Sequence, residues 1–311
     1  MSVVEYGGYS VLMSVYYKEK PEYLKQAIES IQTQTFPTDD FVLVCDGPLN
    51  DGLDAIIAEK QQEMGDILNV VRLAKNGGLG NALNEGIKHC KNELVARMDS
   101  DDIAYSNRCE KQVTLFASDH RVSLSSGVVY EFETNPASVT GIRRLPCEYQ
   151  EIVAFSHKRN PMNHPCVMFK KSAVQTAGGY QEKYHLFEDY DLWIRMLQNG
   201  YRAQNLPEVL LYMRAPADMY LRRGGIAYVK DMLRFHWWMH ENGWTSLAEF
   251  STGALPHALV CIMPNNMRGM IYKMLHSKKM CVWGGVSHKT YRFCIRFVSL
   301  TGNHNVELEA A

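Results

Sequence analysis

Long apolar runs and a secretory leader are both missing from this sequence. The best apolar stretch, Ala258 to Met263, is far shorter than the ~20 residues that a transmembrane helix needs. The opening residues lack the basic and apolar regions of a secretory signal. We therefore expect a cytoplasmic protein without a membrane span.

Cysteine motifs and a strong net charge are missing as well. Eight cysteines are present, but none forms a Cys-x-x-Cys pair or has a histidine partner at zinc-finger spacing. We therefore expect neither a disulfide framework nor a zinc site, and we interpret the cysteines as small buried hydrophobes. The formal net charge of -1 gives no overall attraction to nucleic acid, so no nucleic-acid partner is expected.

What is present suffices for an enzyme core. The 311 residues are 46% hydrophobic and 22% charged, as in an ordinary globular protein. This length accommodates one large domain with an appendage. We place the domain in residues 1–225 and a helical appendage in residues 226–311, where basic and aromatic residues gather. The appendage is a candidate for contact with a membrane surface or an acceptor.

Short apolar runs alternate with segments of helical periodicity along the chain. We expect strands at residues 10–16, 41–45, 67–73, 94–98, 122–130 and 166–169. We expect helices at residues 21–31, 53–64, 80–90, 190–199, 228–242 and 267–275. This order predicts an α/β fold with a mostly parallel sheet flanked by helices, whose ligands bind at the carboxyl ends of the strands.

A cluster of carboxylates, Asp99, Asp101 and Asp102, follows directly after one predicted strand. Carboxylates this close repel one another unless a cation lies among them. Magnesium or manganese is the simplest such cation, because it binds carboxylate and phosphate oxygens and neutralises a leaving diphosphate. The alternative is a solvated acidic turn in which an Asp caps a helix. The position at a strand end favours the metal.

A second group of acids, Glu188, Asp189 and Asp191, stands in front of a predicted helix. Acids in this place suit the helix dipole, which is an adequate structural explanation. The functional interpretation is a general base, which takes a proton from an acceptor hydroxyl while a metal holds the departing diphosphate. Two acid clusters far apart in sequence fit these two duties.

Each of the remaining motifs can be interpreted either as a structural feature or as part of a binding site. The segment 76–81 is either a phosphate cradle or a tight turn that opens a helix. Asp46 is either a turn residue or an acceptor for a nucleobase N–H. A lone histidine such as His164 more often serves structure than ligation. Arg222 and Arg223 either recognise a diphosphate or form a solvated basic turn.

Taken in order, these pieces resemble the bacterial family 2 glycosyltransferases of the GT-A fold that build O-antigen or exopolysaccharide. The resemblance covers about the first 225 residues and is carried by the segments 14–19, 24–34, 46–47, 76–79, 98–102, 178–180 and 188–193.

The resemblance implies a role for each matching residue. The nucleotide-sugar donor is expected at Val15, Tyr17, Glu19, Asp46, Asn76, Asp99, Ser100 and Asp101. Asp101 is the expected direct ligand of Mn2+ or Mg2+, with Asp99 near the ribose or the metal, and Asp189 is the expected catalytic base. Contact with the acceptor or the diphosphate is left to Asp102, His164, Glu188, Arg222 and Arg223.

The implied activity is transfer of a hexose, of glucose or galactose type, from a UDP-sugar to a sugar on a polyprenyl diphosphate, with inversion. The segment 263–273 is similar to the tail of exopolysaccharide transferases, which implies docking on the inner face of the plasma membrane. The chain departs from many relatives at Tyr17, where Asn is common, and at residues 82–84, where an Arg is common. The sequence does not reveal the oligomeric state.

Two other functions stay open. The first is a catalytically inactive nucleotide-sugar-binding subunit of a polysaccharide assembly complex, and the intact Asp99, Asp101 and Asp189 count against it. The second is a nucleotidyltransferase, which requires a glycine-rich loop with Arg or Lys after the first strand. This chain has residues 16–19, Tyr-Tyr-Lys-Glu, at that place.

Overall fold

The computed structural model describes residues 7–216 and 225–262. These residues divide into two compact units. The first unit holds residues 7–156, 160–183 and 188–216, and the second holds residues 157–159, 184–187 and 225–262. No helix in the described ranges combines the length and the apolar character needed to cross a membrane. The predicted helix at 267–275 lies outside these ranges.

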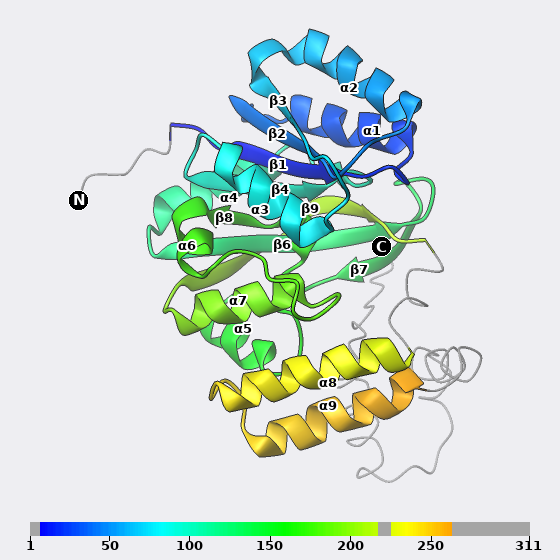
Figure 1. Cartoon of the computed structure of the whole chain (residues 1–311). Coiled ribbons are helices and arrows are strands. Elements are labelled where there is room, and N and C mark those ends of the chain that lie inside the picture. The colour runs from blue at the N-terminus through cyan, green and yellow to red at the C-terminus, as the bar shows by residue number, and fades with distance from the viewer. Residues whose placement is uncertain (1–6, 217–224, 263–311) are drawn as a thin grey trace. The chain divides into compact units, whose positions relative to one another are not determined.

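Among the described residues, the first unit contains a nine-stranded sheet (Figure 1). The strands follow the order β3-β2-β1-β4-β8-β6-β9-β5, and β7 pairs with β6. Neighbours are parallel from β3 to β4 and between β6 and β9, and antiparallel elsewhere. The strands are β1 (Ser10–Val15), β2 (Asp40–Cys45), β3 (Leu68–Arg72), β4 (Leu94–Asp99), β5 (Ile103–Ala104), β6 (Val122–Phe132), β7 (Val139–Arg143), β8 (Met168–Lys170) and β9 (Arg202–Arg214).

Helices connect these strands and confirm the predicted α/β fold. They are α1 (Pro21–Gln32), α2 (Asp51–Met64), α3 (Leu79–His89), α4 (Arg108–Ser118), α5 (Tyr149–Ser156), α6 (Lys171–Thr176) and α7 (Glu188–Gln198), with the short 3-10 turns η1 (Gly65–Ile67) and η2 (His164–Cys166). The sequence did not predict α4 or β9. In β9, Pro207 and the exposed Glu208 interrupt the apolar run, so the strand lacks a clean period-two pattern.

The order of the first four strands creates a switch point between β1 and β4. The chain moves outward from β1 to β3 and then returns to β4, so right-handed crossovers place α1 and α2 on one face of the sheet and α3 on the other (Figure 1). Helix α3 lies very close to the sheet, because a Cβ on Gly86 would stand 2.3 Å from Cδ1 of Leu12 and 2.7 Å from Cγ2 of Val44. Ligands of such sheets bind outside the switch point, at the carboxyl ends of the strands.

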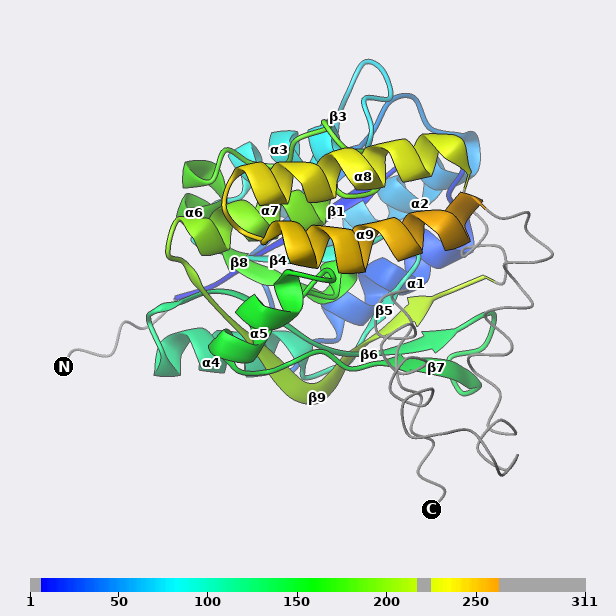
Figure 2. The same cartoon turned by 90° about the horizontal axis from the view of Figure 1, so that it is seen from below.

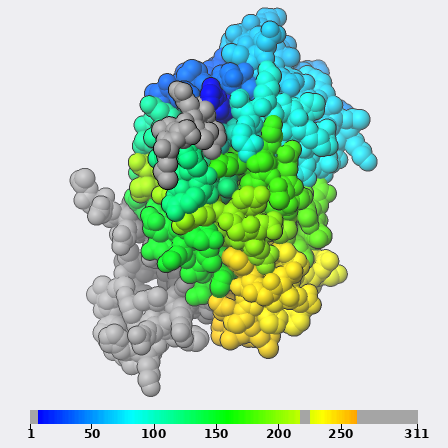
Figure 3. Space-filling view, turned by 90° about the vertical axis from the view of Figure 1, so that its left-hand side faces the viewer, coloured from blue at the N-terminus to red at the C-terminus, as the bar shows by residue number. Residues whose placement is uncertain are grey.

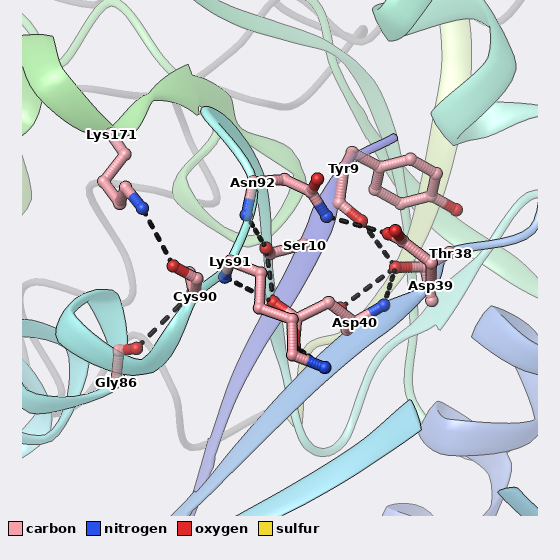
Figure 4. A network of polar contacts seen from close by, with 10 residues as sticks. All are labelled: Tyr9, Ser10, Thr38, Asp39, Asp40, Gly86, Cys90, Lys91, Asn92 and Lys171. Atoms are coloured by element: carbon pink, nitrogen blue, oxygen red, sulfur yellow. Dashed lines mark hydrogen bonds and ion pairs between the residues drawn. The ribbon is translucent and has the colours of Figure 1, made fainter. Parts of the chain in front are cut away.

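A polar network closes the opposite, amino end of β1 and β2 (Figure 4). Asp40, which is fully buried, accepts hydrogen bonds from the Ser10 hydroxyl (2.5 Å) and the Lys91 backbone N–H (2.8 Å). The Ser10 oxygen in turn accepts the backbone N–H of Asn92 (3.0 Å). The network thus ties the loop before β4 to the starts of β1 and β2, since a buried carboxylate is tolerated only when it is hydrogen-bonded. In Figure 3, the described N-terminal part of the chain, coloured blue to cyan, lies together at the top of the view.

Two helices form the described core of the second unit. Helices α8 (Ile226–Glu241) and α9 (Leu247–Ile262) lie side by side in both cartoon views (Figures 1 and 2). Aromatic side chains fill this unit, with Phe235 stacked on Phe187 (5.3 Å between ring centroids) and on Trp238 (5.9 Å). Helix α8 was predicted within two residues of its observed ends. Helix α9 was not predicted, because Pro256 lies inside it.

Candidate functional site

The predicted nucleotide-binding residues lie at the carboxyl ends of β1, β2 and β4. The strand register pairs Val15 with Cys45 and Ser14 with Asp99. The backbone N–H of Asp46 donates to the carbonyl of Val15 (2.8 Å). The first strand, the Asp46 turn and the Asp99 cluster therefore share one edge of the sheet, as the sequence predicted.

Asp46 uses its carboxylate to hold the glycine turn. Its Oδ1 accepts the backbone N–H of Gly77 (2.7 Å) and its Oδ2 accepts that of Gly78 (3.0 Å), while the Asn76 amide donates to the Asp46 carbonyl (3.1 Å). Gly47 has a φ of +87°, and a Cβ there would lie 2.6 Å from the Asn76 nitrogen. These N–H groups are engaged by a carboxylate, which favours the tight-turn interpretation over a phosphate cradle.

The loop after β1 leads from the sheet edge to the carboxylate cluster. Tyr16 and Tyr17 are 41% and 52% exposed, with their rings edge to face at 5.9 Å. Glu19 follows, and its Oε2 accepts the hydroxyl of Ser100 (3.0 Å). The exposed rings of Tyr16 and Tyr17 therefore lie on a loop that Glu19 ties to the carboxylate cluster through Ser100.

Asp99 is held by an arginine of its own strand. Both guanidinium Nη atoms of Arg97 bond the two carboxylate oxygens of Asp99, one of them at 3.1 Å. The Arg97 side chain is 1% exposed and the Asp99 side chain 35% exposed. The bidentate pair fixes the Asp99 carboxylate in one orientation.

Burial and neighbouring negative charges disfavour the ionised forms of Asp101 and Asp102. Burial raises the pKa of Asp101 to about 7, and the neighbouring charges of Asp99 and Glu19 contribute to the rise. Burial, reinforced by Asp101 and Asp99, also raises the pKa of Asp102 well above its usual value. Asp102 is 1% exposed, and its Oδ2 has no hydrogen-bond partner. Such atoms fit a site that a cation completes.

The described side chains by themselves do not make a full metal cage. In the described ranges, no three His, Cys, Asp or Glu residues gather in a geometry that would hold a metal ion. A cation here would need further oxygens, as Mg2+ sites commonly take from substrate phosphates.

Arg214, at the end of β9, anchors the same cluster and was not singled out from the sequence. Its backbone N–H donates to Oδ1 of Asp102 (2.8 Å), and its Nε donates to the carbonyl of Asp101 (3.1 Å). The guanidinium lies over the rings of Tyr23, at 3.7 Å, and Phe132, at 4.6 Å. A residue more than a hundred positions away therefore holds the turn of the carboxylate cluster.

The second acid group divides into two distinct roles. Asp189, near the start of α7, accepts the Asn160 amide through Oδ2 (2.6 Å) and the Tyr190 N–H through Oδ1 (2.8 Å). Asp191 is 1% exposed and pairs with Arg195 (2.7 Å). Asp189 is thus the half-buried carboxylate of the pair, and Asp191 serves the packing of α7. Glu188 is the first residue of α7 and is also half-buried.

His164 and Tyr180 form a polar contact with each other. His164 Nε2 and the Tyr180 hydroxyl are 3.0 Å apart. Burial, with the Arg97 charge, holds the pKa of His164 well below its usual value, so the imidazole is neutral at neutral pH. Burial raises the pKa of the Tyr180 phenol, and both Asp189 and Asp99 add to the rise. The two carboxylates therefore lie within electrostatic range of one phenol.

Several organising residues were missed at the level of sequence. Arg97 could have been found, because residues two apart on a strand point to the same face. Arg214 and Asn160 could not, since their partners are distant in the chain. The predicted Arg222 and Arg223 lie outside the described residues.

The chain matches known proteins across this site. Residues 10–177 match the family model described as "Glycosyl transferase family 2". The amylovoran biosynthesis glycosyltransferase AmsE of Erwinia amylovora is 42% identical over 229 residues, which are 73% of this chain and 84% of that protein. A UDP-Gal:alpha-D-GlcNAc-diphosphoundecaprenol beta-1,3-galactosyltransferase of Escherichia coli is 35% identical over 265 residues, which are 85% of this chain and 95% of that protein.

A solved structure shares the fold. The mannosyltransferase PcManGT from Pyrobaculum calidifontis, in complex with GDP-Man and Mn2+, aligns with a TM-score of 0.57 at 18% identity. The alignment covers 94% of this chain and 85% of that chain. This likeness confirms the predicted GT-A type of fold.

Proposed function

The chain belongs to glycosyl transferase family 2, and we propose that it transfers a hexose from a UDP-sugar to a saccharide carried on a polyprenyl diphosphate, with inversion at the anomeric carbon. The E. coli relative, which matches over nearly its whole length, is a UDP-Gal-dependent galactosyltransferase that acts on a diphosphoundecaprenol-linked sugar, and this supports the donor and acceptor class. AmsE, named for amylovoran biosynthesis, supports a role in exopolysaccharide or O-antigen synthesis.

The donor occupies the sheet edge in this proposal. Tyr17 and the turn fixed by Asp46 flank the nucleoside, and Asp99, held by Arg97, faces the ribose or the diphosphate. Because the Asp46 turn and the Asp99 carboxylate are each tied to a strand end, these groups lose little conformational freedom when the donor binds.

Mn2+ or Mg2+ fits the carboxylate cluster. The raised pKa values of Asp101 and Asp102 and the unpaired buried Oδ2 of Asp102 are those of carboxylates that lack a cation. Asp101 would hold the ion, with Asp99 beside it. When bound, the ion neutralises charge on the departing diphosphate.

Asp189 is the proposed general base. It removes the proton from the acceptor hydroxyl as that oxygen forms a bond to the anomeric carbon. The bond from that carbon to the UDP oxygen breaks at the same time, and UDP leaves with the electron pair. The Asn160 hydrogen bond orients the Asp189 carboxylate for this step. Attack opposite the leaving group inverts the configuration, so an α-linked donor gives a β-linked product.

One observation carries the proposal. The ring of Tyr180 packs against Trp193 of α7, with 6.3 Å between the ring centroids, and the charges of Asp189 and Asp99 add to the effect of burial in raising the pKa of its phenol. The helix that carries the proposed base and the strand that carries Asp99 are therefore both near one buried side chain. An inactive binding subunit has no need of a second, oriented carboxylate there.

A panel of UDP- and GDP-sugars tests the proposal. The protein is incubated with Mn2+ and each donor, with and without a synthetic lipid-diphosphate-linked N-acetylglucosamine. We expect slow UDP release that the acceptor accelerates, with a UDP-hexose as the best donor and loss of turnover in EDTA. Tight UDP binding with no release from any donor would instead support the inactive subunit.

With a lipid-linked acceptor, we also propose that the protein works at the inner face of the plasma membrane. Leu255, Leu259 and Ile262, spaced for one face of α9, are each at least 44% exposed. Such a stripe suits the boundary of a bilayer. Sedimentation with anionic vesicles tests this location, and a protein that stays in the supernatant at low salt contradicts it.

A further inference from the structure

The turn at residues 177–180 is held by two helices at once. From α3, the Asn84 side-chain amide donates to the Tyr180 carbonyl (2.8 Å), and its oxygen accepts the Tyr180 N–H (2.8 Å). From α7, the Arg195 guanidinium donates to the Gly179 carbonyl (2.7 Å) and to the Ala177 carbonyl. Paired bonds to the same backbone fix the orientation of the turn as well as its distance.

Glycine makes this close approach possible. Gly178 and Gly179 have φ values of +86° and +65°, in the region that favours glycine. A Cβ on Gly179 would lie 2.6 Å from Oδ1 of Asn84. The turn therefore needs glycine at position 179 both for its backbone and for the approach of Asn84.

Each helix also carries one side of the proposed active site. Helix α3 begins at the glycine turn that Asp46 holds, and Asn84 lies one turn into it. Helix α7 begins beside Asp189, and its Arg195 is fixed by Asp191 through Nε (2.9 Å) and Nη2 (2.7 Å). The turn at 177–180 is thus a bridge from the donor side to the base.

We propose that Asn84 and Arg195 are positioning residues, which set the distance between Asp189 and the donor through this bridge. The inference rests on the proposed function, because it assigns catalysis to Asp189. A displacement of about 1 Å in such a geometry costs ~10²-fold in rate. A weakened bridge should therefore slow the transfer step while the donor side, built on separate bonds, keeps its affinity.

Asn84→Asp is the sharpest test from the α3 side. The variant keeps size and one acceptor oxygen, but replaces the donor to the Tyr180 carbonyl by a second oxygen. We expect kcat to fall by roughly 10-fold to 100-fold, with the Kd for UDP in MnCl2 unchanged within about twofold. Asn199→Asp, at an exposed residue that follows α7, is the matched control and should keep the wild-type kcat.

Arg195→Lys tests the bridge from the α7 side, because one ammonium cannot span the two carbonyls as the guanidinium does. We again expect a lower kcat with an unchanged Kd for UDP. If a thermal scan shows that Asn84→Asp is unfolded, Arg195→Lys takes its place as the test of the bridge.

Hydrogen exchange gives a readout apart from activity. In Asn84→Asp, repulsion between the second carboxylate oxygen and the Tyr180 carbonyl should loosen the turn, so the Tyr180 amide should exchange faster although its acceptor oxygen is kept. The Gly77 and Gly78 amides bound by Asp46 should keep their protection. An unchanged kcat, or a UDP affinity that falls in step with kcat, would overturn the inference. Failure of the wild-type protein to release UDP from any donor would count against the proposed function instead.

Discussion

Arg97 and Asp99 form a bidentate ion pair two residues apart on β4, with the arginine almost fully buried. The pair points a carboxylate toward the carboxyl edge of the sheet and neutralises part of the charge of the acidic cluster. Burial and, after it, the Arg97 charge lower the pKa of His164, so the cation that orients Asp99 also helps to keep the neighbouring imidazole neutral.

Replacing Arg97 by lysine should affect the orientation of the Asp99 carboxylate more than the stability of the fold. A lysine keeps the charge but cannot bond both carboxylate oxygens. Loss of a charged hydrogen bond is worth about 1.5 to 3 kcal/mol, so we expect donor affinity to weaken by roughly 10-fold or more. Calorimetry with UDP and MnCl2 measures this, and an unchanged Kd would show that Asp99 does not face the donor.

Asp101→Asn should abolish metal binding and yet stabilise the metal-free protein at alkaline pH. The pKa of Asp101 is about 7 in the folded state and near 3.9 unfolded, so its ionisation lowers the free energy of unfolding as pH rises from about 4 to about 7. In EDTA at about pH 8, the variant should melt above the wild type by a few degrees, at ~2 to 4 °C per kcal/mol. At about pH 4 the difference should vanish. A lower melting temperature at both pH values would argue against a strained carboxylate.

Affinity for Mn2+ should rise with pH. Protons compete with the cation for Asp101, whose pKa lies at about 7, so each unit below that value lowers the affinity by up to ~10-fold. Titration of MnCl2 at about pH 6, 7 and 8 follows this change. An Mn2+ affinity that does not change across this pH range would show that a residue other than Asp101 is the metal ligand.

Asp189→Asn should remove transfer while leaving UDP binding intact. The amide can still accept the hydrogen bond of Asn160, but it cannot take a proton from the acceptor. General-base catalysis contributes typically 10² to 10⁴-fold, so we expect kcat to drop by about that factor. Asp66→Asn, at an exposed carboxylate that follows α2, is the control. Near-normal turnover in Asp189→Asn would assign the base to another residue.

Arg214→Lys should loosen the carboxylate cluster from the far end of the chain. The lysine loses the contact with Tyr23 and Phe132 and the fork toward Asp101 and Gln26. We expect weaker Mn2+ binding together with a lower melting temperature. Arg202→Lys changes an arginine that lies over Tyr149 at the other end of β9 and should leave Mn2+ affinity alone. If both variants change the Mn2+ affinity and the melting temperature equally, Arg214 stabilises the fold and has no specific effect on the carboxylate cluster.

The sequence predicted those features that depend on neighbouring residues. Buried runs and helical periodicity located β1 to β4 and α1 to α3, and the position of Asp46 and Asp99 after strands placed both at one edge. The contacts that organise the site join distant segments, as when Arg214 meets Asp102 across 112 positions. No local pattern encodes such a contact. Asn84 shows the same limit, because its helix was predicted while its hold on Tyr180 was not.

The sequence does contain a local signal for the start of α9, although Pro256 inside the helix argued against predicting it. The Ser246 N–H donates to the Glu249 carboxylate (2.8 Å) and the Glu249 N–H donates to the Ser246 hydroxyl oxygen (3.2 Å), which is the capping box of a helix start. Glu249 also contacts His157 (3.0 Å). A capping box before an apolar segment therefore indicates a helix more reliably than Pro256 argues against one.

The stereochemistry and the metal requirement of the transfer product test the central claim most directly. A UDP-hexose with an α-anomeric bond is incubated with Mn2+ and a lipid-diphosphate-linked N-acetylglucosamine, and the anomeric coupling of the new linkage is read by NMR. We predict a β-linked disaccharide and stoichiometric UDP, with no product in EDTA. An α-linked product, or full activity without a divalent cation, would contradict the account.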